Sequence, residues 1–314
     1  MIYLIFIITI FISIVVYFRI ADHYQIIDKP NERSSHTEIT IRGGGVIYLV
    51  AALLAVIVHP TFWLPILSMF IIGIISFIDD RITLSSKFRL AFHLLAVTLL
   101  FYDLGIFTAY PIWLIPVFYI MVIGIINAYN FMDGINGITG VYSVVILGGL
   151  QYVNYQVERF IEPDLIWLPI IASIVFLFFN FRVKARCFAG DVGSVTIAFW
   201  ILLLLIQLMM QTGHLSYLLF LAVYGVDAVL TIIHRLILKQ NIFEPHRLHF
   251  YQILANEQQW SHRLVSVLYG IIQLIIMVLV ILFPAHLALL FIGITLPLAL
   301  IYILMKPKIM LPAT

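Results

Sequence analysis

Apolar residues run in long blocks along this chain, and short polar segments separate the blocks. About eleven blocks approach the roughly 20 residues that a helix needs to cross a bilayer. This pattern predicts an all-α, polytopic membrane protein with about eleven transmembrane helices, or ten if two short runs merge. No linker rich in proline and serine divides the chain, so we expect one integral-membrane domain over 1–314. The predicted spans are 2–18, 45–60, 63–78, 88–104, 111–130, 137–154, 165–180, 193–211, 215–238, 264–283 and 286–305.

Composition agrees with a membrane protein. The 314 residues are 63% hydrophobic and only 10% charged, whereas a soluble domain is nearer half apolar. The first apolar run has no basic segment before it and no small-residue cleavage site, so we do not expect a cleavable signal peptide. Its basic flank, Arg19, follows the run, which predicts an N-terminus outside. The single cysteine, Cys187, excludes an internal disulfide and does not support a zinc site.

Lysine and arginine test this orientation. With the N-terminus outside, 16 of the 17 Lys and Arg residues fall on the inner side, and only Arg159 lies outside. Such an imbalance is typical of a correct layout, because cytoplasmic loops carry the positive charge. Eleven spans then leave the C-terminus inside. The expected active-site loops, all cytoplasmic, are at about 19–44, 79–88, 130–137, 181–193 and 239–263.

Acidic residues gather at the same inner side. Asp79, Asp80, Asp133 and Asp191 lie in inner loops or at inner helix ends, near the glycine-rich segments "RGGGV", "DGINGI" and "AGDVGS" that precede helices. Helix N-termini with glycine favour bound anions, which predicts a phosphate-rich ligand. Carboxylates beside phosphates repel them unless a cation lies between. We therefore expect Mg²⁺, with Mn²⁺ as the alternative, and phosphoryl chemistry at a membrane surface.

Two further segments carry polar side chains that suit this chemistry. "NIFEPHRLHFYQIL" contains two histidines around an arginine; histidine titrates near neutral pH, and arginine forks onto phosphate. "NAYNFMDG" places Asn127, Asn130 and Asp133 about one helical turn apart, where they could read a base or a sugar. Hydrogen bonding between helices is the alternative for these amides.

Asp227 is the one acid well inside a predicted span. Acids within a membrane are functional candidates, but this one could instead cap a neighbouring helix or pair with a buried polar group. An ion-coupled transporter would scatter ionisable groups along a path near the midplane. Here they form a one-sided layer, so a transporter remains only the alternative hypothesis.

Five segments in order resemble a known superfamily, the polyprenyl-phosphate N-acetylhexosamine-1-phosphate transferases of glycosyltransferase family 4. They are "DKPNERSSHTEITIRGGG", "FIDDRITLSSK", "NAYNFMDGING", "FAGDVGS" and "PHRLHFYQ", and the resemblance runs from Asp28 to about His262. It implies that a polyprenyl phosphate, such as undecaprenyl phosphate, attacks the β-phosphate of a UDP-N-acetylhexosamine such as UDP-GlcNAc. The products are polyprenyl-diphospho-HexNAc and UMP, and Mg²⁺ is required. No nucleic acid is implied, and a homodimer is left open.

The residues and the resemblance together give the candidate site. Asp191 matches the family's principal Mg²⁺ ligand, and Phe188 matches a residue that can stack on uracil. The catalytic candidates are Asp79, Asp80, Asp191, His246 and His249, and the metal candidates are Asp191 and Asp79. The substrate-binding candidates are Lys29, Arg33, Arg42, Lys87, Asn127, Asn130, Asp133, Phe188 and Arg247.

At two positions the sequence differs from many members of this superfamily. Asn136 stands where many members have a second aspartate, and Phe250 stands where a third histidine often follows. Phe250 argues against a phospho-MurNAc-pentapeptide transferase, which stays the alternative within the family. "HRLHFYQ" looks more like bacterial enzymes that start O-antigen or related lipopolysaccharide glycans. We therefore expect a multi-pass protein of the bacterial inner membrane with its active site on the cytoplasmic face; the sugar is not assigned.

Overall fold

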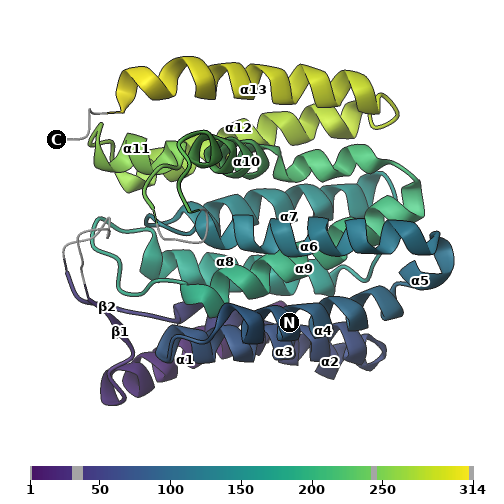
Figure 1. Ribbon diagram of the computed structural model, residues 1–314. Helices are drawn as coiled ribbons and strands as arrows, with labels where there is room; N and C mark the ends of the chain where they lie inside the picture. Colours follow the sequence, from purple (N-terminus) through teal and green to yellow (C-terminus); the bar gives the residue numbers. More distant parts are fainter. Residues whose placement is uncertain (1, 30–37, 242–245, 311–314) are drawn as a thin grey trace.

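The protein is an all-helical bundle apart from one very short strand pair (Figure 1). The computed structural model describes residues 2–29, 38–241 and 246–310. Within them the thirteen α-helices are α1 Ile2–His23, α2 Ile47–Val58, α3 Trp63–Arg81, α4 Ser86–Asp103, α5 Ile106–Ala109, α6 Ile115–Phe131, α7 Ile138–Gln156, α8 Asp164–Asn180, α9 Gly190–Thr212, α10 Ala222–Ile237, α11 Phe250–Asn256, α12 His262–Leu282 and α13 Leu287–Ile309. Short 3₁₀ segments are Gly44–Val46, Pro60–Phe62, Ile112–Leu114 and Leu215–Leu221.

Each of the eleven predicted spans overlaps one long helix, and the two extra helices, α5 and α11, are short connectors. Seven helices in the described part of the chain are long and apolar enough to cross a membrane, counting the 3₁₀ turns that lead into α3, α6 and α10. The others are α1, α9, α12 and α13. The chain is therefore a polytopic membrane protein, and the number of eleven crossings stays a prediction.

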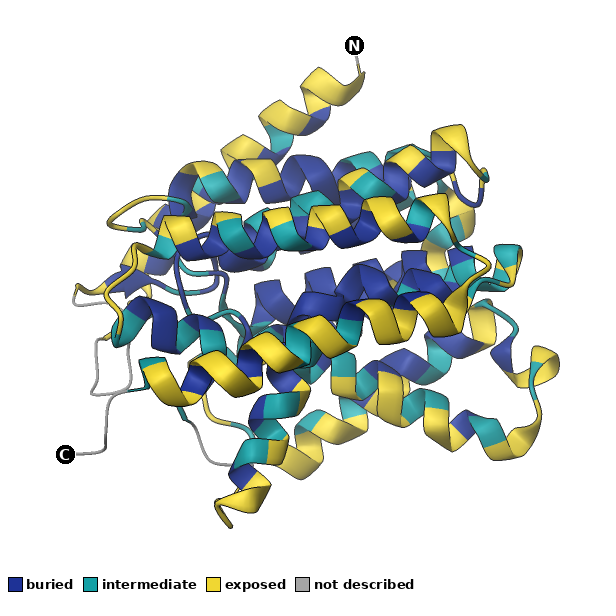
Figure 2. Cartoon of the chain, turned by 90° about the horizontal axis from the view of Figure 1, so that it is seen from above, coloured by how far each residue is buried: buried dark blue, intermediate teal, exposed yellow. Residues whose placement is uncertain are grey.

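α9 lies at the centre of the bundle and is buried almost throughout, against α3, α6 and α7. The peripheral helices α1 and α13 instead carry many exposed large apolar side chains on their outer faces (Figure 2). An apolar exterior around a packed core suits a lipid environment, where helices satisfy their own backbone hydrogen bonds.

The polar loops collect at one end of the bundle. Figure 1 shows the strand pair, α11 and the C-terminus at the left, and α5 at the opposite end. β1 (Ile27–Asp28) pairs antiparallel with β2 (Thr40–Ile41), and Ile41 also bridges to the buried Cys187. The sequence did not predict these strands, because two-residue strands leave no periodic pattern. Through the bridge between Ile41 and Cys187, the strand pair after α1 is joined to the loop before α9.

Candidate functional site

Asp80, at the end of α3, holds the beginning of α9. Its Oδ1 accepts the N–H of Asp191 at 3.0 Å, and its Oδ2 accepts the N–H of Val192 at 3.1 Å. Arg42 Nε lies 2.7 Å from the same Oδ1, and the Asp80 side chain is 0% exposed. A carboxylate here satisfies two N–H groups that the helix leaves unpaired and complements the helix dipole. Asp80 therefore joins α3, α9 and the loop after β2.

Gly190 makes this contact fit. Its φ of +71° lies in the left-handed region that favours glycine. A Cβ at this position would lie 2.6 Å from Asp80 Oδ2. The glycine directly before Asp191 is thus required by the approach of the carboxylate to the helix start.

Asp79 has a separate set of partners. Its Oδ1 accepts the Leu84 N–H at 2.7 Å, and its Oδ2 lies 2.8 Å from Arg89 Nη1. Each of the two adjacent carboxylates therefore has its own arginine. These arginines already offset much of the negative charge of the pair without a metal ion.

Asp191 is less engaged than either member of that pair. Its side chain is 23% exposed, and its ion pair within the described ranges is a long one, 3.7 Å to Arg42 Nη2. The nearby Asp133 accepts a hydrogen bond from Thr139 Oγ1 at 2.5 Å. Burial raises the pKa of Asp133 to about 6; the Thr139 hydroxyl opposes the rise and the Asp191 carboxylate adds to it. A cation beside the two aspartates would keep both ionised.

These donors fit Mg²⁺ in part. No group of three His, Cys, Asp or Glu side chains that could hold a metal ion occurs among the residues that the structure describes. Mg²⁺ is nevertheless often bound through one or two carboxylates plus substrate phosphates and water. Asp191 suits that role, with Asp133 nearby. Asp79 already uses one lone pair of each oxygen for its contacts with Leu84 and Arg89 and is therefore less open to a metal ion than Asp191.

The glycine-rich segments use their amides within the protein. The Gly45 N–H donates to the Ala189 carbonyl at 3.0 Å, and the Gly137 N–H donates to Asn180 Oδ1 at 2.6 Å. The first amides of α9 go to Asp80. The structure therefore does not support phosphate binding on these amides. Gly45 instead allows close packing, because a Cβ there would lie 2.1 Å from Gly193 Cα.

The two predicted asparagines on α6 have different surroundings. Asn130 Oδ1 accepts a hydrogen bond from Ser194 Oγ of α9 at 2.7 Å, so it links two helices. Asn127 donates to the Ile123 carbonyl of its own helix at 2.8 Å. Contact with a substrate stays a prediction for both.

A cavity of about 280 Å³ lies next to the segment that leads into α9. Phe188, from that segment, and three basic residues are part of its lining. Asn136 holds its rim, donating to the carbonyls of Arg182 at 2.9 Å and Val183 at 3.3 Å. An ionised aspartate could not donate these bonds, which explains why this chain has an amide at 136. The lining residues are Glu38, Thr40, Asn136, Arg182, Val183, Lys184, Ala185, Phe188, Ser261, His262 and Arg263.

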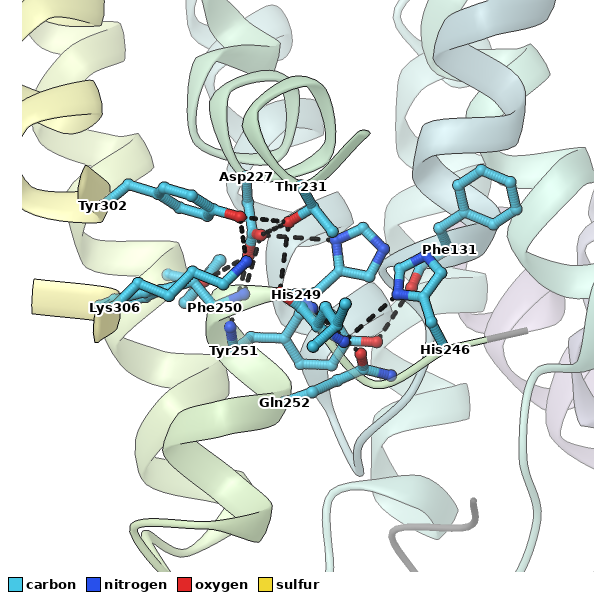
Figure 3. A network of polar contacts seen from close by, with 12 residues as sticks. Phe131, Asp227, Thr231, His246, His249, Phe250, Tyr251, Gln252, Tyr302 and Lys306 are labelled. Carbon is cyan, nitrogen blue, oxygen red and sulfur yellow. Dashed lines mark hydrogen bonds and ion pairs between the residues drawn. The ribbon is translucent and has the colours of Figure 1, made fainter. Parts of the chain in front are cut away.

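The histidine segment lies just before α11 (Figure 3). His249 is 2% exposed, and its Nδ1 lies 3.4 Å from Asp227 Oδ1. His246 Nδ1 accepts the Leu248 N–H at 3.2 Å. Burial, together with the neighbouring His249, lowers the pKa of His246 to about 3, so His246 is neutral at physiological pH. Arg247 is half-buried beside them.

Three predicted substrate-binding residues are not placed with the groups described above. Lys29 and Lys87 are exposed, and Arg33 lies outside the described residues. The sequence analysis also missed Arg89 as the partner of Asp79. Arg89 lies ten residues further along the chain, in the next helix, and no local pattern marks that pairing.

Comparison with known proteins shows which enzymes the chain is similar to. Residues 62–209, which include the Asp79–Asp80 pair, Asp133, Phe188 and Asp191, match the family model "Glycosyl transferase family 4". The chain is 28% identical over 257 residues to a probable undecaprenyl-phosphate N-acetylglucosaminyl 1-phosphate transferase of Bacillus subtilis (strain 168), covering 75% of this chain and 71% of that protein.

Other relatives lie at similar distance. An undecaprenyl-phosphate alpha-N-acetylglucosaminyl 1-phosphate transferase of Yersinia pestis is 25% identical over 260 residues, or 75% of this chain and 71% of that protein. A phospho-N-acetylmuramoyl-pentapeptide-transferase of Lactobacillus acidophilus is 27% identical over 183 residues, or 49% and 56%. Residues 62–209 are thus similar to glycosyl transferase family 4, and the chain is distantly homologous to the undecaprenyl-phosphate GlcNAc-1-phosphate transferases.

Proposed function

We propose that the protein transfers N-acetylhexosamine 1-phosphate from a UDP-sugar to polyprenyl phosphate and releases UMP. The observation that carries the proposal is the junction at the start of α9, where Asp80 and Arg42 fix Asp191 beside Asp133. UDP-GlcNAc and undecaprenyl phosphate are the first substrates to test, because the names of the first two relatives state undecaprenyl phosphate and N-acetylglucosaminyl 1-phosphate. Initiation of O-antigen or another envelope glycan would follow from that product.

The reaction needs two phosphate groups brought together in line. An oxygen of the lipid phosphate forms a bond to the β-phosphorus, and the bond from that phosphorus to the oxygen bridging to the α-phosphate breaks, so UMP leaves. Positioning and charge neutralisation carry most of such a reaction. Mg²⁺, when bound, would offset the negative charge of the phosphates. In our proposal Asp191 holds the ion, while Asp80, which already accepts three donors, positions Asp191 rather than taking a proton.

The cavity around Phe188 suits the nucleotide. We assign the Phe188 ring to stacking on uracil, with the basic side chains of the cavity near the diphosphate. Base–aromatic stacking is worth about 1–3 kcal/mol. Phe188→Ala should therefore raise the KM for the UDP-sugar roughly tenfold with little change in kcat, as measured by UMP release. Phe188→Tyr keeps a stacking ring and serves as the control; equal KM values for the two variants would refute the assignment.

The proposed orientation has eleven crossings, an N-terminus outside and the site at the cytoplasmic face of a bacterial inner membrane. It rests on the one-sided distribution of Lys and Arg. In intact cells, a membrane-impermeant maleimide should label Arg159→Cys, whereas Lys308→Cys should react only after permeabilisation. The native Cys187 is buried and gives little background. The reverse labelling pattern would overturn the orientation.

The function is tested with the purified protein in detergent. UMP release is measured with undecaprenyl phosphate, Mg²⁺ and a panel of UDP-HexNAc donors, together with UDP-MurNAc-pentapeptide. We expect release that depends on the lipid and on the metal, stops with EDTA and returns with Mg²⁺ or Mn²⁺. A preference for the pentapeptide donor would favour the other branch of the family. No UMP from any donor would sink the proposal.

A further inference from the structure

Asp227 lies on α10, buried inside a predicted span, yet its carboxylate is fully used. Oδ1 accepts the Phe250 N–H at 2.9 Å and the Thr231 hydroxyl at 3.2 Å. Oδ2 accepts the Tyr251 N–H at 3.3 Å and the Tyr269 hydroxyl at 2.7 Å. Four donors around one carboxylate stabilise its charged form. Asp227 thus holds the first turn of α11, as Asp80 holds the first turn of α9.

The same carboxylate also faces His249, which directly precedes α11. His249 Nδ1 lies 3.4 Å from Asp227 Oδ1, and an acceptor at this position favours the proton on Nδ1. Both ring nitrogens are buried and make no hydrogen bond in the part of the chain that the structure describes, and of the two Nδ1 is the one that faces the Asp227 carboxylate. An unsatisfied buried polar atom costs about 1–3 kcal/mol, which is tolerated where a ligand completes it.

The other nitrogen, Nε2, belongs to a ring held beside the α6–α7 loop. The His249 ring centroid lies 4.8 Å from that of His246 and 6.4 Å from that of Phe131, at the end of α6. Tyr251 Oη donates to the Phe131 carbonyl at 2.9 Å, which fastens α11 to the segment that leads into Asp133. Figure 3 shows the His249 ring between Asp227 on one side and His246 and Phe131 on the other.

Side chains of α13 are connected to Asp227 through a chain of hydrogen bonds. Thr231 Oγ1, which donates to the carboxylate, lies 2.7 Å from Tyr302 Oη, and Lys306 Nζ contacts the same phenol. The side chains of α13 therefore help to fix the carboxylate that faces His249.

We infer that Asp227 is a positioning residue for the transfer reaction: it fixes the backbone and the tautomer of His249, so that the unprotonated Nε2 accepts a hydrogen bond from a protonated phosphate oxygen of the bound substrates. The inference rests on the proposed function and adds a residue to it. In a site of this kind, supporting contacts around a ligand-binding side chain typically change activity by about 10–100-fold.

A double-mutant cycle tests the inference in the full-length protein. Asp227→Asn should lower the initial rate of UMP release about 10–100-fold, and His249→Ala should lower it at least as much. If Asp227 acts through His249, Asp227→Asn added to His249→Ala should cost no more than about twofold, because effects of coupled residues do not add. A merely structural Asp227 would cost the same factor in both backgrounds, and that result would overturn the inference.

A second measurement does not depend on how Asp227→Asn folds. In the wild-type protein labelled with ¹⁵N-histidine, the His249 signals are assigned by their loss in His249→Ala. In the neutral ring we expect the proton on Nδ1; a proton on Nε2 instead would contradict the inference.

Asp164→Asn is the matched control. Asp164, at the start of α8, also faces a histidine and a tyrosine: His59 Nε2 lies 3.1 Å away, and the Tyr3 hydroxyl donates at 2.7 Å. It lies at the other end of α8 from the loop that lines the cavity. We expect its rate within about twofold of wild type. A wild type without UMP release would refute the function; an active wild type with an additive cycle would refute only the role of Asp227.

Discussion

Asp191→Asn is expected to reduce Mg²⁺-dependent UMP release by roughly a thousandfold, while the protein remains folded. Asparagine keeps the shape of the side chain, and among the described residues the ion pair that Asp191 would lose is a long one. A neutral amide is a poor Mg²⁺ ligand, and charge stabilisation of several kcal/mol depends on that ion. The rate is measured over a range of Mg²⁺ concentrations, because a weakened site should not reach the wild-type maximum.

The control is Asp103→Asn, at the other end of α4 from Arg89. We expect it to retain wild-type turnover and the same elution profile in size-exclusion chromatography. Near-normal turnover of a folded Asp191→Asn protein would show that Asp191 is not the metal ligand.

Asp80→Ala should destabilise the protein and also inactivate it. The change leaves two N–H groups of α9 and the Arg42 guanidinium without their shared acceptor. Loss of a buried, charge-assisted acceptor of this kind costs about 2–4 kcal/mol of unfolding free energy. Thermal unfolding in detergent should show a lowered midpoint, and UMP release should be lost because Asp191 is no longer held.

Asp79→Ala shows which carboxylate of the Asp79–Asp80 pair contributes more to stability. The contacts of Asp79 lie five and ten residues along the chain, whereas those of Asp80 connect α3 with α9 over more than a hundred residues. We therefore expect Asp79→Ala to lower the unfolding midpoint less than Asp80→Ala. The opposite order would contradict the structural role given to Asp80.

The helices could be predicted from the sequence because each apolar block is a local signal. All eleven blocks overlap helices, and the boundaries differ by a few residues. The strand pair Ile27–Asp28 with Thr40–Ile41 escaped prediction, since two-residue strands leave no periodic pattern and their partners are not neighbours in the sequence. α11 escaped as well, because seven residues of mixed polarity do not define a helical period.

The sequence indicated which candidate residues gather at one end of the helices better than it indicated how they are connected. Inner-loop charges and glycines predict the chemistry at that end, and this location stays a prediction. They did not reveal that Asp80 binds the α9 amides, or that Asp227 binds those of α11. Such contacts link residues far apart in sequence, so neither spacing nor composition encodes them.

The hydrogen bonds of Asp227 also argue against the transporter hypothesis. A transporter would need Asp227 and other acids to line a path through the membrane. The carboxylate instead accepts four hydrogen bonds from its surroundings and faces His249, which is the capping role that we had considered as the alternative.

The central claim, attack by a lipid phosphate on the β-phosphate, is tested most directly with UDP-GlcNAc that is radioactive only in its β-phosphate. Purified protein, undecaprenyl phosphate and Mg²⁺ are incubated with this donor, and the lipid and aqueous phases are separated. We predict that the label moves into the lipid phase in equal amount to the UMP formed, and that omission of the lipid or the Asp191→Asn change prevents it. Label that stays in the aqueous phase while UMP accumulates would mean hydrolysis and would contradict the account.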